Sequence, residues 1–284
     1  MASVVINGGE FDRAVENGLV PQNFKYRFLA EGDSWMDRSS AARPSLLQSL
    51  APAMDAGGDE VLIINLSRFG DTMRRIGECL SPEFAQWTTT QFAWHFDAIL
   101  FSAGGNDFID AARDPAPGQG ILLNLAGQPV PPSGHDCINR NAVGDLITRW
   151  LDPNFTALYD FVQNSRHADV PIFLNCYDTP TARNAPATPN GRTWLREAYL
   201  KNSIPSRHWE DLTGSIFNDI EATITQWAAG RPNVHVVPTV GTLTAAAANS
   251  TGSDADWLNE IHPNRSGWRK LATVWQRDIK DVLP

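Results

Sequence analysis

Four short stretches of the chain, far apart in sequence, carry side chains suited to nucleophilic chemistry. They are Gly32-Asp33-Ser34-Trp35, residues 65–71, residues 104–107 and residues 259–263. A serine hydroxyl is a poor nucleophile until a base accepts its proton, and His262 in the last stretch could be that base. Taken alone, Gly-Asp-Ser is a common turn and helix cap. The three partner stretches favour the catalytic interpretation.

Gly70 and Asn106 have the chemistry of oxyanion donors. A tetrahedral acyl intermediate carries negative charge on one oxygen, and each fixed N–H group aimed at that oxygen contributes roughly 2.7–4 kcal/mol. Gly70 has no Cβ, so its backbone N–H can approach closely. Asn106 can donate from its side-chain amide. The alternative interpretation makes Gly70 a helix-entry glycine and Asn106 a turn residue.

The residues alone leave open which group orients His262. Asn259 lies three residues before His262, and its amide oxygen could accept from the imidazole Nδ1–H and hold the useful tautomer. Asp256 and Glu260 are nearby carboxylates that could instead offset the imidazolium charge. Glu260 is two residues from His262 and is expected to point elsewhere. The hypothesis is a Ser34–His262 pair oriented by Asn259 or by a backbone carbonyl.

The elements that must position these residues alternate between strands and helices. Short apolar runs of the kind used by buried parallel strands predict strands at 25–30, 61–66, 97–102, 171–176 and 234–237. Helical patterns follow at 45–50, 71–80, 142–165, 211–229 and 265–282, with a possible break at Asp152-Pro153. This alternation predicts an α/β fold with a five-stranded parallel sheet covered on both faces.

Two irregular stretches interrupt the alternation. Residues 110–141 are rich in proline and glycine, and residues 178–192 are also irregular. Neither has the apolar periodicity of a separate core, so the prediction is one domain over residues 1–284 with two insertions. Long loops in a compact domain are often functional. Both insertions are therefore candidates for lids or substrate walls.

The order of the four motifs, each at a strand end or before a helix, resembles that of the SGNH (GDSL-type) hydrolases. The resemblance covers the span from Ser34 to His262. It implies a three-layer, flavodoxin-like α/β/α fold and a serine esterase or lipase that cleaves carboxylic esters through an acyl-enzyme on Ser34. It also implies that the Ser34 N–H is a third oxyanion donor beside Gly70 and Asn106. The family usually carries Asp where this chain has Asn259.

The resemblance leaves the ester unnamed: small-molecule, glycan and lipid esters all fit. Trp35 follows the nucleophile and Trp257 lies five residues before His262, so both could line the substrate cleft. The rival functions are an acyltransferase, a carbohydrate O-acetyl esterase on the same scaffold, and a non-catalytic binding module. No His/Asp/Glu cluster has ligand spacing, so neither a metal nor a cofactor is expected.

Composition limits the partners. The 284 residues carry a formal net charge of -9 with no basic run, which argues against nucleic acid and anionic membranes. Three widely spaced cysteines suggest no disulfide framework. No apolar run reaches the roughly 18 residues of a spanning helix, and the N-terminal residues lack a signal-peptide pattern. A cytoplasmic protein is expected, and the sequence is silent on its oligomeric state.

Overall fold

The fold is built around one parallel β-sheet. The structure is a computed structural model that describes all residues except 1, 38–43, 80–81, 90–94 and 284. The strand order is β1-β3-β2-β4-β5-β6, and every neighbouring pair runs parallel. The strands are β1 (Val4–Asn7), β2 (Tyr26–Gly32), β3 (Val61–Asn65), β4 (Ala98–Ser102), β5 (Ile172–Asn175) and β6 (Val234–Val237). All residues of β3, β4 and β5 are buried, as expected for strands covered on both faces.

The sheet has one more strand than the five that the sequence predicts. The additional strand, β1, pairs with β3 at the edge of the sheet, with Val4 opposite Leu62. It is only four residues long, and most of its side chains are partly exposed. A strand this short, ending at Gly8-Gly9, gives no periodic signal. The predicted number of strands is therefore wrong by one, and the predicted parallel arrangement of the strands is confirmed.

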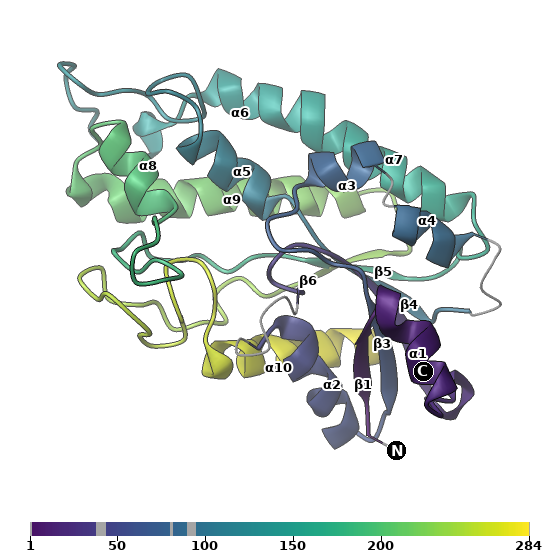
Figure 1. The fold of residues 1–284 in the computed structure, drawn as a ribbon. Helices are drawn as coiled ribbons and strands as arrows, with labels where there is room; N and C mark the ends of the chain where they lie inside the picture. Colours follow the sequence, from purple (N-terminus) through teal and green to yellow (C-terminus); the bar gives the residue numbers. More distant parts are fainter. Residues whose placement is uncertain (1, 38–43, 80–81, 90–94, 284) are drawn as a thin grey trace.

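Helices cover both faces of the sheet in three layers (Figure 1). One face carries α2 (Leu46–Ala56) and α10 (Arg265–Val282), which pack on each other. The opposite face of the sheet carries six of the described helices: α3 (Met73–Cys79), α4 (Pro82–Thr88), α5 (Gly105–Arg113), α6 (Arg140–Leu146), α7 (Asp152–Gln163) and α9 (Trp209–Ala228). The helices α1 (Phe11–Glu16) and α8 (Leu195–Lys201) lie toward opposite ends of the molecule. Among the described residues, none of the helices is long and apolar enough to cross a membrane.

The helical stretch expected at 142–165 is continuous, although its geometry changes midway. A π-helical segment, Ile147–Leu151, joins α6 to α7. Pro153 lies in the first turn of α7, directly after this π-helical segment, and its ring carries no N–H to donate to the preceding turn. The possible break at Asp152-Pro153 is thus replaced by a change of helical pitch.

The two insertions differ in how they are anchored. The first continues past α5 and packs against α8: the Gly118 and Leu125 N–H groups donate to Asn202 at 2.9 Å each. It also contributes buried apolar side chains, including Ile121 and Leu122. The second insertion leads from β5 into α8. Its Ala185 carbonyl accepts the Glu260 N–H at 2.8 Å, which joins it to the loop before α10.

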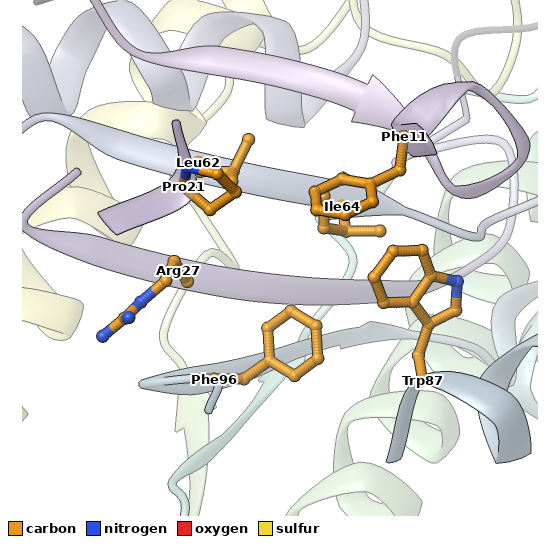
Figure 2. Close-up of a pocket in the computed structure, with 7 residues that line it drawn as sticks. All are labelled: Phe11, Pro21, Arg27, Leu62, Ile64, Trp87 and Phe96. Atoms are coloured by element: carbon orange, nitrogen blue, oxygen red, sulfur yellow. The ribbon is translucent and has the colours of Figure 1, made fainter. Parts of the chain in front are cut away.

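An aromatic cluster packs on the sheet near β1 (Figure 2). The Phe11 and Trp87 rings meet edge to face at a centroid distance of 5.0 Å, and Phe96 lies 6.2 Å from Trp87. In Figure 2 these rings gather over Ile64, and the Arg27 guanidinium points away from them. The cavity between them has a volume of about 10 Å³. This apolar packing attaches α1 and α4 to the sheet and offers no polar group for chemistry.

Candidate active site

The motif residues meet at the carboxyl edge of the sheet. Ser34 follows β2, Gly70 follows β3 and Asn106 lies in the first turn of α5, just after β4. The strand that follows β2 in the chain, β3, lies on one side of it, and β4 lies on the other, so the order in which strands are added to the sheet reverses at β2. Such switch points open a crevice at the carboxyl ends of parallel strands, where ligands bind. His262 enters the same crevice from the loop before α10.

A tight turn after β2 holds Ser34. Gly32 has φ +149°, and a Cβ at this position would lie 2.3 Å from the Ser102 carbonyl oxygen of β4. Glycine is therefore required for the two strands to approach this closely. The Asp33 N–H donates to the same Ser102 oxygen at 2.9 Å, and the Met36 N–H closes the turn on the Asp33 carbonyl at 3.1 Å. Ser34 is left half-buried at the top of this turn.

The Asp33 side chain points down into the sheet and ties three strands together. Its Oδ1 accepts from the Trp35 N–H at 3.0 Å and from Ser102 Oγ at 2.9 Å. Its Oδ2 accepts from the Tyr177 hydroxyl at 2.5 Å. Burial raises the pKa of Asp33 to about 6, although these hydrogen bonds oppose the shift. Asp33 and Tyr177 were given no role from the sequence, and no motif in the residues around Tyr177 marks it.

Ser34, His262 and Asn259 form a hydrogen-bonded chain. His262 Nε2 lies 2.9 Å from Ser34 Oγ, and His262 Nδ1 lies 3.1 Å from Asn259 Oδ1. Asn259 Oδ1 also accepts the backbone N–H groups of His262 at 2.9 Å and of Ile261 at 3.1 Å. These two donors fix which end of the amide faces the ring, because an amide nitrogen there would oppose them. Nδ1 therefore carries the proton, and Nε2 is free to accept from Ser34.

Neither alternative carboxylate reaches the imidazole. Asp256 forms an ion pair with Lys270 and accepts the Thr244 N–H at 2.7 Å. Glu260 is fully buried and points away from His262. Its carboxylate accepts four backbone N–H groups, those of Arg183 (3.1 Å), Trp194 (2.5 Å), Leu195 (3.0 Å) and Arg196 (2.8 Å). Burial raises the pKa of Glu260 to about 6.

The loops after β3 and β4 are tied together beside Ser34. Gly70 has φ +77°, a conformation that L side chains rarely adopt. The Asn106 side-chain amide donates one N–H to the Asp71 carbonyl at 2.9 Å. This bond fixes the plane of the amide and leaves its second N–H available. Asp107, the next residue, accepts the Met73 N–H at 2.8 Å and so connects α5 to the start of α3.

Two aromatic side chains that sequence analysis did not single out flank the histidine. The Phe69 ring stacks on the His262 ring at a centroid distance of 6.0 Å and is 56% exposed, which is unusual for a phenylalanine. The Trp194 ring meets His262 edge to face at 5.5 Å. Phe69 belongs to the loop after β3, and Trp194 follows the second insertion. Together they form an aromatic rim around the imidazole.

The two tryptophans expected to line the cleft, Trp35 and Trp257, are both buried. Trp35 is 4% exposed and Trp257 is 1% exposed. Their rings are 6.5 Å apart, and Trp35 also packs edge to face on Tyr177 and Trp268. Trp257 therefore offers no open substrate surface, whereas Trp35, although buried, is among the residues that line the small cavity beside Ser34.

The space beside Ser34 is small. A cavity of about 10 Å³ adjoins the Ser34 and Asn106 side chains and is closed by Ile109, Phe217 and Ile261. This volume is about that of one water-sized probe. Within the part of the chain that the structure describes, the crevice is therefore shallow at the serine.

Comparisons with known proteins identify the fold of the chain. Neither the family models nor the curated proteins gave a match. Among solved structures, the lipase Lip_vut3 from a goat rumen metagenome is similar, with a TM-score of 0.55, 13% identity, and coverage of 89% of this chain and 97% of that one. A catalytic mutant of Axe2, an acetylxylan esterase from Geobacillus stearothermophilus, has a TM-score of 0.52, 14% identity, and coverage of 90% and 94%. The chain thus has the fold of the SGNH (GDSL-type) hydrolases.

Proposed function

We propose that this chain is a serine hydrolase that cleaves carboxylic esters. One observation carries the proposal: Ser34 Oγ, His262 Nε2 and Nδ1, and Asn259 Oδ1 lie in a continuous hydrogen-bonded chain with distances of 2.9 and 3.1 Å. This is the arrangement that nucleophilic acyl transfer requires. The lipase and acetylxylan esterase activities named for the structural neighbours are consistent with it.

In the proposed reaction, Ser34 Oγ attacks the ester carbonyl carbon while its proton passes to His262 Nε2. The negative charge that forms on the carbonyl oxygen is held by the N–H groups of Ser34 and Gly70 and by the free N–H of Asn106. The intermediate collapses, and His262 gives its proton to the departing alcohol. A water molecule, deprotonated by His262, then attacks the acyl-enzyme. The carboxylic acid leaves and Ser34 regains its proton.

Asn259 orients the base without neutralising it. Its Oδ1 holds the Nδ1–H tautomer but, unlike a carboxylate, supplies no negative charge to the imidazolium formed during attack. Asn259→Asp would add that charge and raise the pKa of the imidazolium. In the variant, the acid limb of the kcat/KM profile is expected at higher pH than in the wild type.

The shallow crevice favours a short acyl group. A cavity of about 10 Å³ beside Ser34 has room for a methyl group and not for an extended hydrocarbon chain. Acetyl esters are therefore the proposed substrates, on an alcohol that lies outside the cavity. A carbohydrate O-acetyl ester fits this description.

The test is hydrolysis of p-nitrophenyl esters of increasing acyl length. The wild type should prefer acetate, and Ser34→Ala and His262→Ala should each lower kcat on the order of 10⁴-fold or more. Asp256→Asn is the matched control at a polar position outside the hydrogen-bonded chain. Activity that survives Ser34→Ala would contradict the mechanism. So would a result in which Asp256→Asn loses activity and Asn259→Ala keeps full activity. Product analysis with added alcohol distinguishes hydrolysis from acyl transfer.

A further inference from the structure

A second, much larger cavity lies on the same edge of the sheet as Ser34. It has a volume of about 760 Å³, within the range of about 300–1,000 Å³ typical of ligand pockets. Three segments form its walls: residues 178–182 after β5, residues 240–249 after β6, and residues 206–213 at the start of α9. The first two segments belong to the loops that lie beneath α8 in Figure 1.

We propose that this cavity binds the alcohol portion of the ester substrate and that this portion is a neutral oligosaccharide. The proposal rests on the proposed esterase function for its link to catalysis, and on the cavity alone for the binding itself. A shallow crevice at Ser34 buries little substrate, so most of the binding energy must come from contacts farther away. The 760 Å³ cavity is positioned to provide them.

The position of the cavity suits an extended substrate. Ser34 follows β2, whereas the cavity walls follow β5 and β6, two and three strands away in the sheet order. Neighbouring strands are about 4.8 Å apart, so the offset along the sheet edge is roughly 10–15 Å. A chain of linked sugar rings can span this offset, with one acetylated ring at Ser34 and later rings in the cavity.

The cavity walls are held rigid by hydrogen bonds. The buried Asp178 carboxylate accepts the N–H groups of Gly241 at 2.9 Å and of Leu243 at 2.6 Å, which joins the loops after β5 and β6. The Thr181 hydroxyl donates to the Ala246 carbonyl at 2.9 Å across the same loops. A preformed wall binds with little ordering of its own residues.

The lining has the mixed character that recognises sugars. Trp209 lines the cavity, and its ring is held in place by its indole N–H, which donates to the Ile204 carbonyl at 3.0 Å, and by the Tyr199 ring at a centroid distance of 6.0 Å. An aromatic ring packs on the C–H face of a sugar, and hydroxyl and amide groups such as those of Thr179 and Asn249 bond its hydroxyls.

The charges in the lining argue against other ligands. Arg207 and Glu210 contribute one charge of each sign, and Asp178 is occupied by backbone N–H groups. A phosphate would need an excess of positive charge. A fatty acyl chain would place polar groups such as Glu210 and Asn249 against hydrocarbon.

The cavity wall also continues into the catalytic loop. The segment 178–182 leads directly to Arg183, which is fully buried and donates from Nη2 to the Asn259 carbonyl at 2.8 Å. The Ala185 carbonyl accepts the Glu260 N–H at 2.8 Å. A ligand in the cavity therefore rests on the segment that holds the His262 loop.

The first experiment measures binding without turnover. Ser34→Ala protein is titrated with xylohexaose, cellohexaose and mannohexaose by calorimetry, and at least one should bind. Adding Ala248→Trp, which fills the cavity from its exposed rim, should weaken that binding by about tenfold or more. The matched control is Ala247→Trp, on the next residue but outside the lining, which should leave binding unchanged. Trp209→Ala is a second variant that should also weaken it.

The second experiment measures turnover. Ala248→Trp should lower kcat/KM for an acetylated hexasaccharide of the sugar that binds by about tenfold, and leave p-nitrophenyl acetate hydrolysis unchanged. Ser34-dependent hydrolysis of p-nitrophenyl acetate with no hexasaccharide binding would overturn the cavity proposal alone. Equal effects of Ala248→Trp and Ala247→Trp would also overturn it. So would a cavity that binds decanoate and no hexasaccharide, if Ala248→Trp abolishes the decanoate binding.

A protein that binds a hexasaccharide specifically but has no esterase activity would contradict the proposed function instead.

Discussion

Glu31 places a carboxyl group inside the sheet, three residues before Ser34. Its Oε1 accepts the Gly32 N–H at 2.8 Å, and within the described part of the chain its Oε2 has no hydrogen-bond partner. Burial raises the pKa of Glu31 from 4.5 to about 8. The folded protein therefore keeps this group protonated over a pH range in which the unfolded chain has already released the proton.

This difference predicts a pH-dependent loss of stability. Below pH 4.5 both states are protonated, and between 4.5 and about 8 only the folded state is. The unfolded state then binds fewer protons, so the free energy of unfolding falls as pH rises, by up to about 1.4 kcal/mol per pH unit. Glu31→Gln, which cannot ionise, should show a weaker fall between pH 5 and pH 8 in urea unfolding. Exposed Glu10→Gln is the control, and equal slopes in the two variants would contradict the assignment.

At the scale of elements, two separate sets of contacts hold the candidate active site in place. The Ser34 turn is fixed within the sheet by Asp33, Ser102 and Tyr177. The His262 loop is fixed from outside the sheet by Arg183 and Glu260, which bind it to the second insertion and to α8. Both groups act through other residues and are positioning residues.

Glu260→Gln tests the second support. The substitution places an amide NH₂ against backbone N–H donors, which should lower the free energy of unfolding by about 1–3 kcal/mol. Since the Trp194 N–H is among those donors, the aromatic rim around His262 should loosen as well. We expect kcat to fall with little change in KM for p-nitrophenyl acetate.

The matched control for this test is Glu197→Gln, a glutamate in the first turn of α8 that pairs with exposed Arg192. If both variants have the same unfolding free energy and the same kcat, Glu260 does not position the loop. Urea unfolding and steady-state kinetics on the two proteins decide the question.

The elements that sequence analysis predicted well are those with strong local patterns. The helix expected at 265–282 is α10 with the same bounds, and the strand expected at 234–237 is β6. The edge strand β1 is too short to give a pattern. A buried apolar run or an amphipathic helix is visible in sequence because its neighbours in the chain share its environment.

The grouping of the candidate site residues could be predicted in part for a similar reason. Ser34, Gly70, Asn106, Asn259 and His262 lie within short motifs next to predicted elements, and the structure brings them to one crevice. Tyr177, Arg183 and Trp194 act through contacts with residues distant in sequence, and nothing local marks them. Trp257 does not line the small cavity, because proximity in sequence to His262 does not determine which way a ring points, whereas Trp35 does line it.

At the scale of the whole molecule, the first insertion is part of the packed structure. Its Ile121, Leu122 and Leu125 side chains are buried, and it is hydrogen-bonded to Asn202 at the end of α8. None of its residues lines the small cavity beside Ser34. The expectation that it forms a lid over that cavity finds no support in these contacts.

Excising residues 115–132 should therefore affect the fold more than the substrate range. Burial of each leucine or isoleucine contributes about 1.5–3 kcal/mol, so losing three should lower the melting temperature markedly. The control replaces only the exposed residues 126–130 with glycine and serine. A shortened protein that melts like this control but shows a changed acyl-length profile would restore the lid interpretation.

The hydrogen bond between Ser34 and His262 joins residues 228 positions apart in the chain. During synthesis the nucleophile leaves the ribosome first, and its base follows only after those positions have been translated. At about 5–20 residues per second, the interval is roughly 10–45 s. Throughout it the nascent chain carries a serine without its base, so the proposed hydrolysis cannot begin before residue 262 has been synthesised.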